Sequence, residues 1–231
     1  MLIDSANLDN DEILKADICI IGGGVAGIVL ALELEDKFDN IILLESGGEN
    51  YEESQQKLYE IDHYPRHFPN PTHSRLRFLG GSSNHWENNT SEFDALDFKK
   101  RAWLENSEWP ISLADLKPFY QQAAAYCGTE TDSYELDYWQ KKLVGVDLFK
   151  LSHNLTTGIA KYASIPTRFY AVNKSRLVNS KVIKIITHAN VVDLDYDETS
   201  KQVSTVSFLH LNTIHKVAAK FFTMCLGGIE N

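Results

Sequence analysis

The sequence predicts an α/β fold built on a parallel sheet, and three observations carry this prediction. Residues 18–21 and 41–44 are short, continuous apolar runs, the pattern of strands that are buried on both faces. Between them, a glycine cluster precedes an apolar helical pattern from Val25 to Glu35. From Lys181 onward, apolar and alternating runs separated by turn residues predict further strands. Residues 16–48 therefore predict a strand–helix–strand unit, the repeating element of parallel sheets.

The other segments follow in order along the chain. Residues 75–90 form a loop rich in glycine and serine, and residues 94–128 have a helical pattern with a helix start at Ser112. Residues 181–228 predict a strand, then a hairpin or three-stranded meander, and a last strand over 221–226. No repeat or flexible linker separates these segments, so we expect one domain.

The bulk composition indicates a soluble globular protein. The chain has 231 residues, of which 43% are hydrophobic and 23% charged, enough to bury one sizeable core. Its 22 basic and 32 acidic residues give a net charge of −10, which disfavours attraction to nucleic acid or to anionic membranes. The longest uncharged run, residues 18–32, is shorter than the roughly 20 residues that a membrane-spanning helix needs. We therefore expect neither a nucleic-acid partner nor a membrane span.

Cysteine and histidine usage gives no sign of a metal site. The three cysteines lie far apart without a C-x-x-C motif, which favours a reducing compartment over a disulfide framework. His63, His67 and His73 are irregularly spaced in a proline-rich stretch, so we expect solvated histidines and no metal ligands. The acidic N-terminus lacks the pattern of a secretory signal. The expected location is the cytoplasm.

The glycine cluster carries the first functional signal. Gly22, Gly24 and Gly27 form G-x-G-x-x-G between a predicted strand and a predicted helix. In this context the first glycine allows a sharp turn, the second admits a pyrophosphate and the third allows close helix packing, while the helix N-terminus attracts the anion. Glu45 ends the next strand, where a carboxylate can bind the ribose of an adenosine. The alternative is a glycine turn without a ligand. These residues do not decide between NAD and FAD.

A second glycine pair lies in the loop of residues 75–90. Gly80 and Gly81 are followed by hydrogen-bonding side chains, and such a backbone can approach a second stretch of pyrophosphate or a flavin ring. The alternative is a surface Gly/Ser turn. The loop residues that follow the glycines are Ser82, Ser83, Asn84 and His85.

Several blocks together resemble one family. The runs ADICIIGGGVAGIVLALELE, IILLESGG, RFLGGSSNHW and WLENSEWPISLADLKPFYQQAAAYCG, followed by PTRF, HANVV and MCLGGIEN, are similar in order and spacing to the glucose-methanol-choline (GMC) flavoproteins. The resemblance covers nearly the whole chain. His85 and Trp86 depart from the commonest loop and are more similar to the pyranose-oxidase and sugar-dehydrogenase branch.

The resemblance implies FAD as cofactor and assigns roles to individual residues. Gly22, Gly24, Gly27 and Glu45 would hold the ADP half, and residues 80–84, including Ser82 and Asn84, would approach the pyrophosphate and flavin. Val191 would contact adenine, and the late pair Gly227 and Gly228 would line the cofactor. His85 matches a histidine that some members bond covalently to the flavin.

The implied activity is FAD-dependent oxidation of a CH–OH group in a sugar or alcohol. In the family, a C-terminal histidine with a His or Asn partner takes the hydroxyl proton, and no residue of this chain matches either. We therefore expect the catalytic residues beyond Asn231, so that the chain supplies only the FAD-binding portion and oxidises no alcohol alone. One alternative is a non-catalytic remnant, or a flavin-binding subunit that needs a second polypeptide. An NAD-dependent enzyme would explain neither Gly80 and Gly81 nor the terminal glycine pair.

Overall fold

In the computed structural model the chain divides into two compact units, because residues 86–167 make contacts mainly among themselves. We call them the sheet unit (Met1–His85 and Arg168–Asn231) and the helical unit (Trp86–Thr167). The structure describes residues 1–9, 12–61, 69–129, 132–145, 147, 151–152 and 155–231.

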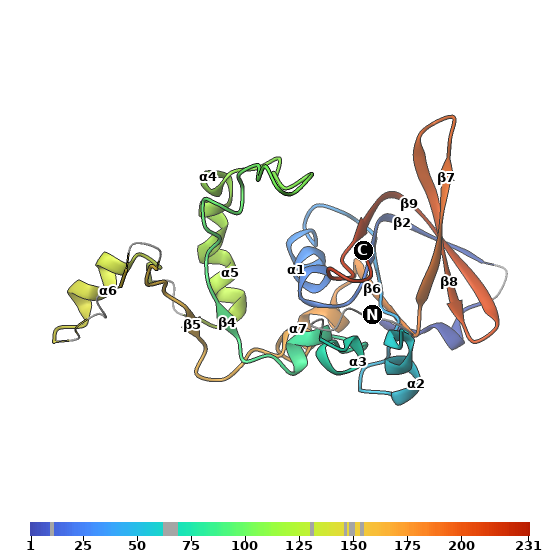
Figure 1. Cartoon of the computed structure of the whole chain (residues 1–231). Coiled ribbons are helices and arrows are strands. Elements are labelled where there is room, and N and C mark those ends of the chain that lie inside the picture. The colour runs from blue at the N-terminus through green and yellow to red at the C-terminus, as the bar shows by residue number, and fades with distance from the viewer. Residues whose placement is uncertain (10–11, 62–68, 130–131, 146, 148–150, 153–154) are drawn as a thin grey trace. The chain divides into compact units, whose positions relative to one another are not determined.

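The sheet unit is built on seven strands, which confirms the predicted α/β class. Their order across the sheet is β1-β6-β3-β2-β9-β8-β7. The first five strands in this order, from β1 to β9, pair in parallel; β8 pairs antiparallel with β9, and β7 pairs antiparallel with β8. The predicted three-stranded meander is therefore present as β7-β8-β9 (Figure 1). The bounds are β1 (Leu2–Asp4), β2 (Ile13–Ile21), β3 (Ile41–Leu44), β6 (Ile183–Thr187), β7 (Asn190–Asp197), β8 (Gln202–His210) and β9 (Thr213–Met224).

The two apolar runs of the βαβ unit become neighbouring parallel strands, with Ile18 paired to Ile41 and Ile21 to Leu44. Successive side chains along each strand point to opposite faces of the sheet. Cys19, Ile21, Ile42 and Leu44 join one buried cluster with side chains of the meander. Because both faces are covered, these strands are apolar at every position. The meander side chains of this cluster are Val206, Phe208 and Val217.

β9 differs from the sequence-based expectation, which placed a separate last strand over residues 221–226. One continuous strand, Thr213–Met224, forms instead and pairs with β2 on one side and β8 on the other. β8 pairs with residues 213–218 and β2 with residues 216–224, so the strand has a partner on at least one side from end to end and the polar residues within it do not break it.

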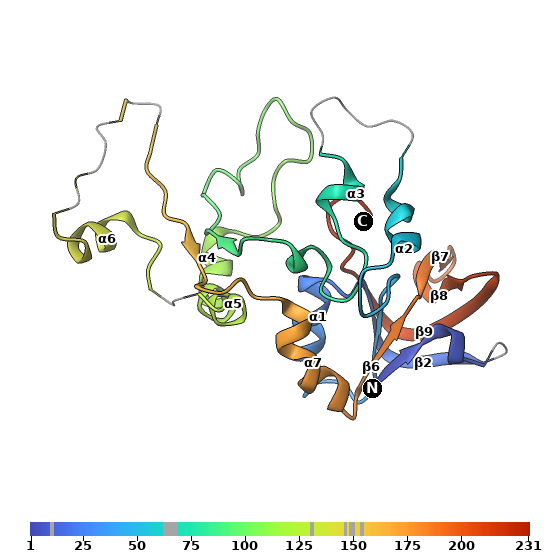
Figure 2. The same cartoon turned by 90° about the horizontal axis from the view of Figure 1, so that it is seen from below.

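Helices α1 (Val25–Glu33) and α7 (Phe169–Asn179) pack against each other in the sheet unit, side by side in Figures 1 and 2. The Arg176 guanidinium fastens the pair, because it donates to the Leu32 carbonyl at 3.0 Å and binds Glu35 at 2.9 Å. Short helices follow β3, in a stretch whose prolines do not allow a long helix. They are α2 (Glu53–Gln56), η2 (Lys57–Tyr59), α3 (Pro71–Ser74) and η3 (Gly81–Asn84), and η1 (Ser5–Asn7) follows β1.

Within the segment 94–128 of the helical unit, which was expected to be helical, helix is confined to the second half. Ser112 begins it with a capping box, in which the Asp115 carboxylate accepts from both the backbone and the hydroxyl of Ser112. Asn88 is fully buried and connects distant segments of this unit. Its side-chain amide donates to the Cys127 carbonyl at 2.8 Å and accepts from the backbone N–H of Thr167 at 3.1 Å. Its elements are β4 (Asn89–Thr90), α4 (Leu113–Leu116), η4 (Lys117–Phe119), α5 (Tyr120–Cys127), α6 (Leu136–Lys142) and β5 (Lys161–Tyr162). Among the helices described in either unit, none has the length and apolar character to cross a membrane.

Candidate functional site

The three motif glycines differ in how much space surrounds them. A Cβ atom on Gly22 would lie 2.5 Å from the Cys225 carbonyl oxygen, and one on Gly27 would lie 1.9 Å from the Gly22 carbonyl oxygen. Neither position has room for a side chain, and Gly22 also has φ of +106°. A Cβ atom on Gly24 would meet nothing within 4 Å. The turn is therefore packed on the protein side and open at Gly24, which caps the N-terminus of α1.

Glu45 lies directly beside this turn. It is only 6% exposed, and its two carboxylate oxygens accept the N–H of Gly23 at 2.8 Å and of Gly47 at 2.9 Å. Burial raises the pKa of Glu45, although the two backbone hydrogen bonds and the nearby charge of Arg77 oppose the rise. Each oxygen still has acceptor capacity, so the carboxylate that fixes the turn can also receive a ribose hydroxyl.

Arg77 is the main site residue that sequence reasoning did not single out. Its side chain is 8% exposed; it donates to the Ser46 hydroxyl at 3.1 Å and forms an ion pair with Glu230 at 3.0 Å. The guanidinium also lies 4.2 Å from the centre of the Tyr59 ring. A buried cation thus balances the Glu45 carboxylate and joins the turn after β3 to the C-terminal residues. The only sequence signal was its position in the loop of residues 75–90.

The second glycine pair packs onto the first motif. The Gly80 N–H donates to the Gly23 carbonyl at 2.8 Å, and a Cβ atom on Gly81 would lie 3.2 Å from the Gly24 Cα. Both glycines have positive φ, +95° and +52°. The structure therefore brings together two motifs that are more than 50 residues apart in the sequence. The open position at Gly24 is bordered by this loop.

The side chains of the loop hold its own backbone. The Asn84 amide donates to the carbonyls of Leu79 and Gly81, both at 3.0 Å, and the buried Ser83 hydroxyl donates to the Gly80 carbonyl at 2.7 Å. Ser82 is half-buried, and His85 is exposed where η3 ends. The N–H groups of the two glycines are bonded within the protein as well, because Gly80 donates to Gly23 and Gly81 donates to the Phe78 carbonyl at 2.7 Å.

The remaining predicted residues lie on the C-terminal strands and tail. Val191 on β7 is half-buried and packs against the buried cluster beneath the meander. Gly227 and Gly228 are exposed, and a Cβ atom on either would meet nothing within 4 Å. The tail that carries them starts beside the glycine turn, because the Cys225 N–H donates to the Ile21 carbonyl at 2.7 Å.

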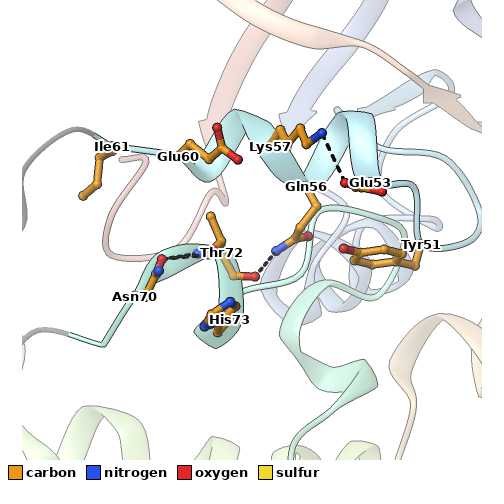
Figure 3. A pocket seen from close by; sticks show the side chains of 9 residues that line it. All are labelled: Tyr51, Glu53, Gln56, Lys57, Glu60, Ile61, Asn70, Thr72 and His73. Atoms are coloured by element: carbon orange, nitrogen blue, oxygen red, sulfur yellow. Dashed lines mark hydrogen bonds and ion pairs between the residues drawn. The ribbon is translucent and has the colours of Figure 1, made fainter.

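A cavity of about 350 Å³ lies elsewhere in the sheet unit, between α2 and α3 (Figure 3). None of the predicted cofactor-binding residues lines it. His73 reaches it and is exposed, as the sequence led us to expect, while His63 and His67 lie outside the described residues. No cluster of three or more metal-ligating side chains occurs within the part of the chain that the structure describes.

Comparison with known proteins shows the fold. No family model and no curated protein sequence matches the chain. Solved structures do: pyridoxine 4-oxidase from Mesorbium loti is 18% identical with a TM-score of 0.55, over 93% of this chain and 50% of that one. Formate oxidase from Aspergillus oryzae RIB40, solved to study FAD modification, is 17% identical with a TM-score of 0.54, over 92% and 45%. A fungal aryl-alcohol oxidase is 14% identical with a TM-score of 0.54, over 94% and 46%. The chain thus spans about half the length of these oxidases.

Proposed function

We propose that this chain binds FAD, with the pyrophosphate at the open position beside Gly24 and the adenosine ribose on Glu45. One observation carries the proposal: among the three motif glycines, two are closed by backbone and only Gly24 faces open space at a helix N-terminus. This is the steric pattern that a dinucleotide-binding turn requires. The similar fold of structures named as oxidases, one of them studied for FAD modification, supports FAD over NAD.

The other predicted residues enter this proposal with the roles implied by the GMC resemblance. Gly80, Gly81, Ser82 and Asn84 would shape the loop beside the pyrophosphate and flavin, and the loop packs against the Gly23–Gly24 backbone as this requires. Val191 would approach the adenine. Gly227 and Gly228 would line the cofactor from the tail that follows β9.

We further propose that the chain is the FAD-binding portion of a GMC-type oxidoreductase that acts on a CH–OH group of a sugar or alcohol. FAD would accept the hydride, and this chain would bind and orient it. The general base would come from a segment outside residues 1–231. Support comes from the sequence resemblance and from solved oxidases about twice as long as this chain. A cytoplasmic location, which the cysteine pattern favours, belongs to the same proposal.

His85 is the residue that a covalent bond to the flavin would use, and its exposed ring at the end of the loop leaves it accessible. Denaturing the flavin-loaded chain and measuring its mass decides this point. A mass increase by one FAD on the peptide that contains His85 would establish the bond, and release of all flavin would exclude it.

The test of FAD binding compares Gly24→Val with Gly158→Val. Both glycines face open space and neither has a positive φ, but only Gly24 lies at the predicted pyrophosphate position. Titration of the purified chain with FAD, followed by quenching of flavin fluorescence, should show binding for the wild type and for Gly158→Val. Gly24→Val should lose binding while its circular dichroism stays unchanged. Full FAD affinity in Gly24→Val would contradict the assignment.

A further inference from the structure

His188 forms a cluster with two carboxylates in the sheet unit, close to the turn after β3. Its Nδ1 lies 2.7 Å from Asp4 Oδ2, and its Nε2 lies 2.9 Å from Glu52 Oε1. The three residues come from separate segments: the end of β1, the loop before α2, and the connection between β6 and β7. A carboxylate only accepts hydrogen bonds, and a neutral imidazole has one N–H. Both contacts are hydrogen bonds only when His188 is protonated.

The cluster is attached to the turn that presents Glu45. The backbone N–H of His188 donates to the Gly47 carbonyl at 3.0 Å, and the backbone N–H of Ala189 donates to the backbone carbonyl of Glu45 at 2.9 Å. The side chains close over Gly48, where a Cβ atom would lie 2.2 Å from Glu52 Oε1 and 3.0 Å from His188 Nε2. The backbone of the Glu45–Gly48 turn is thus enclosed between the β6–β7 connection and the Glu52 side chain.

We propose that His188 is a positioning residue for FAD: its protonated ring holds the Glu45–Gly48 turn in place, so that FAD affinity falls when the ring loses its proton. This inference rests on the proposed function. The neutral ring can donate to only one of the two carboxylates and leaves the other unpaired. Glu52 follows Gly48 by four residues, so its release loosens the outer side of the turn. The loosened turn lowers FAD affinity by displacing Glu45, because Glu45 and not His188 is the proposed contact to the ribose.

The direction of the pH effect follows from the groups that face His188. These are Asp4, Glu52 and the His210 ring on β8, whose centre lies 5.9 Å away. Burial alone would lower the pKa of His188, but the hydrogen bond to Glu52 and the charges of Asp4 and Glu52 together raise it above the ordinary value. Because its pKa is raised, the ring of His188 stays mostly charged at pH values above the ordinary histidine pKa. The stabilisation is complete at lower pH and is lost as the pH rises through the raised pKa.

The experiment measures the FAD dissociation constant of the whole chain by flavin fluorescence between about pH 5.5 and 9, a range that brackets the ordinary histidine pKa near 6.5. For the wild type we expect affinity to fall with rising pH, by about tenfold for each unit by which FAD raises the His188 pKa. His188→Gln should bind weakly at every pH. Glu52→Gln should keep a transition that is moved to lower pH, which a purely structural role would not produce.

Four outcomes test the role of His188. His210→Gln removes the other imidazole ring nearby, and it should leave the transition in place. An affinity that does not change with pH, or a transition that survives in His188→Gln, would overturn the inference and leave FAD binding intact. Failure of the wild type to bind FAD at any pH would instead overturn the proposed function, and with it this inference. If His188→Gln does not fold, the shifted transition in Glu52→Gln decides.

Discussion

Replacing Gly27 by alanine should destabilise the sheet unit, because the added methyl group has no room. Its carbon would lie 1.9 Å from the Gly22 carbonyl oxygen and 3.3 Å from Leu43 Cδ1. Since the obstacle is backbone, α1 must move away from the turn by more than an ångström. Overpacking of this kind costs about 3 kcal/mol, and the better helix propensity of alanine returns about 1 kcal/mol. We expect a net loss of about 2 kcal/mol.

Urea and thermal unfolding followed by circular dichroism measure this loss. For a chain of this length, about 2 kcal/mol lowers Tm by roughly 4–8 °C. Gly24→Ala is the matched control, because its methyl group enters open space and its φ of −79° suits alanine. It should cost about 1 kcal/mol or less, the worth of a helix N-cap. Gly27→Ala with the stability of the wild type would refute the close contact between α1 and the Gly22 carbonyl.

Three further predictions use the same unfolding assay. Arg77→Met should lower the free energy of unfolding by about 3 kcal/mol, because it removes a buried cation beside Glu45 and breaks the ion pair with Glu230. The control is Lys57→Met, which breaks an exposed ion pair and should lower the free energy of unfolding by less than about 0.5 kcal/mol. Burial raises the pKa of Glu45 in the folded state above its pKa in the unfolded chain. The free energy of unfolding should therefore fall as the pH rises from the unfolded-state pKa to the folded-state pKa, and a Glu45→Gln variant should lack this pH-dependent loss. Asn88→Ala should destabilise the helical unit by about 3 kcal/mol, because it loses two buried hydrogen bonds and because alanine disfavours the φ of +59° at this position. Asn88→Gly loses the same hydrogen bonds but tolerates this φ, so it should be about 1 kcal/mol more stable than Asn88→Ala. Equal losses in the two variants would show that the backbone conformation does not matter.

Local sequence patterns predicted the central elements of the sheet unit well. The strand at residues 41–44 has the predicted bounds, and α1 begins at Val25 as expected. The meander and the helix start at Ser112 are also confirmed. These elements share a strong local signal: a continuous apolar run, a glycine boundary or a capping side chain.

The missed elements lack such a signal. β1 has three residues in an acidic segment, and it forms because it pairs in parallel with β6 and because the N-terminal ammonium donates to the Ile183 carbonyl at 2.8 Å. α7 mixes apolar residues with five polar ones and is held by its packing against α1. In the candidate site, the glycines and Glu45 were predicted from the motif. Arg77 was not, because a buried arginine has no periodic or motif signature, and its partners come from distant segments.

The pairing of β2 with both β3 and β9 has a consequence for the order of folding. During synthesis, the βαβ unit leaves the ribosome early, but its sheet neighbours arrive only with residues 183–187 and 213–224. At about 5–20 residues per second, this interval lasts on the order of ten seconds or more. Until then the apolar strands Ile18–Ile21 and Ile41–Leu44 have open edges, which invite pairing with other chains. A nascent chain that stalls within the helical unit should therefore require a chaperone, and mutations that slow closure by β9 should reduce yield more than they reduce stability.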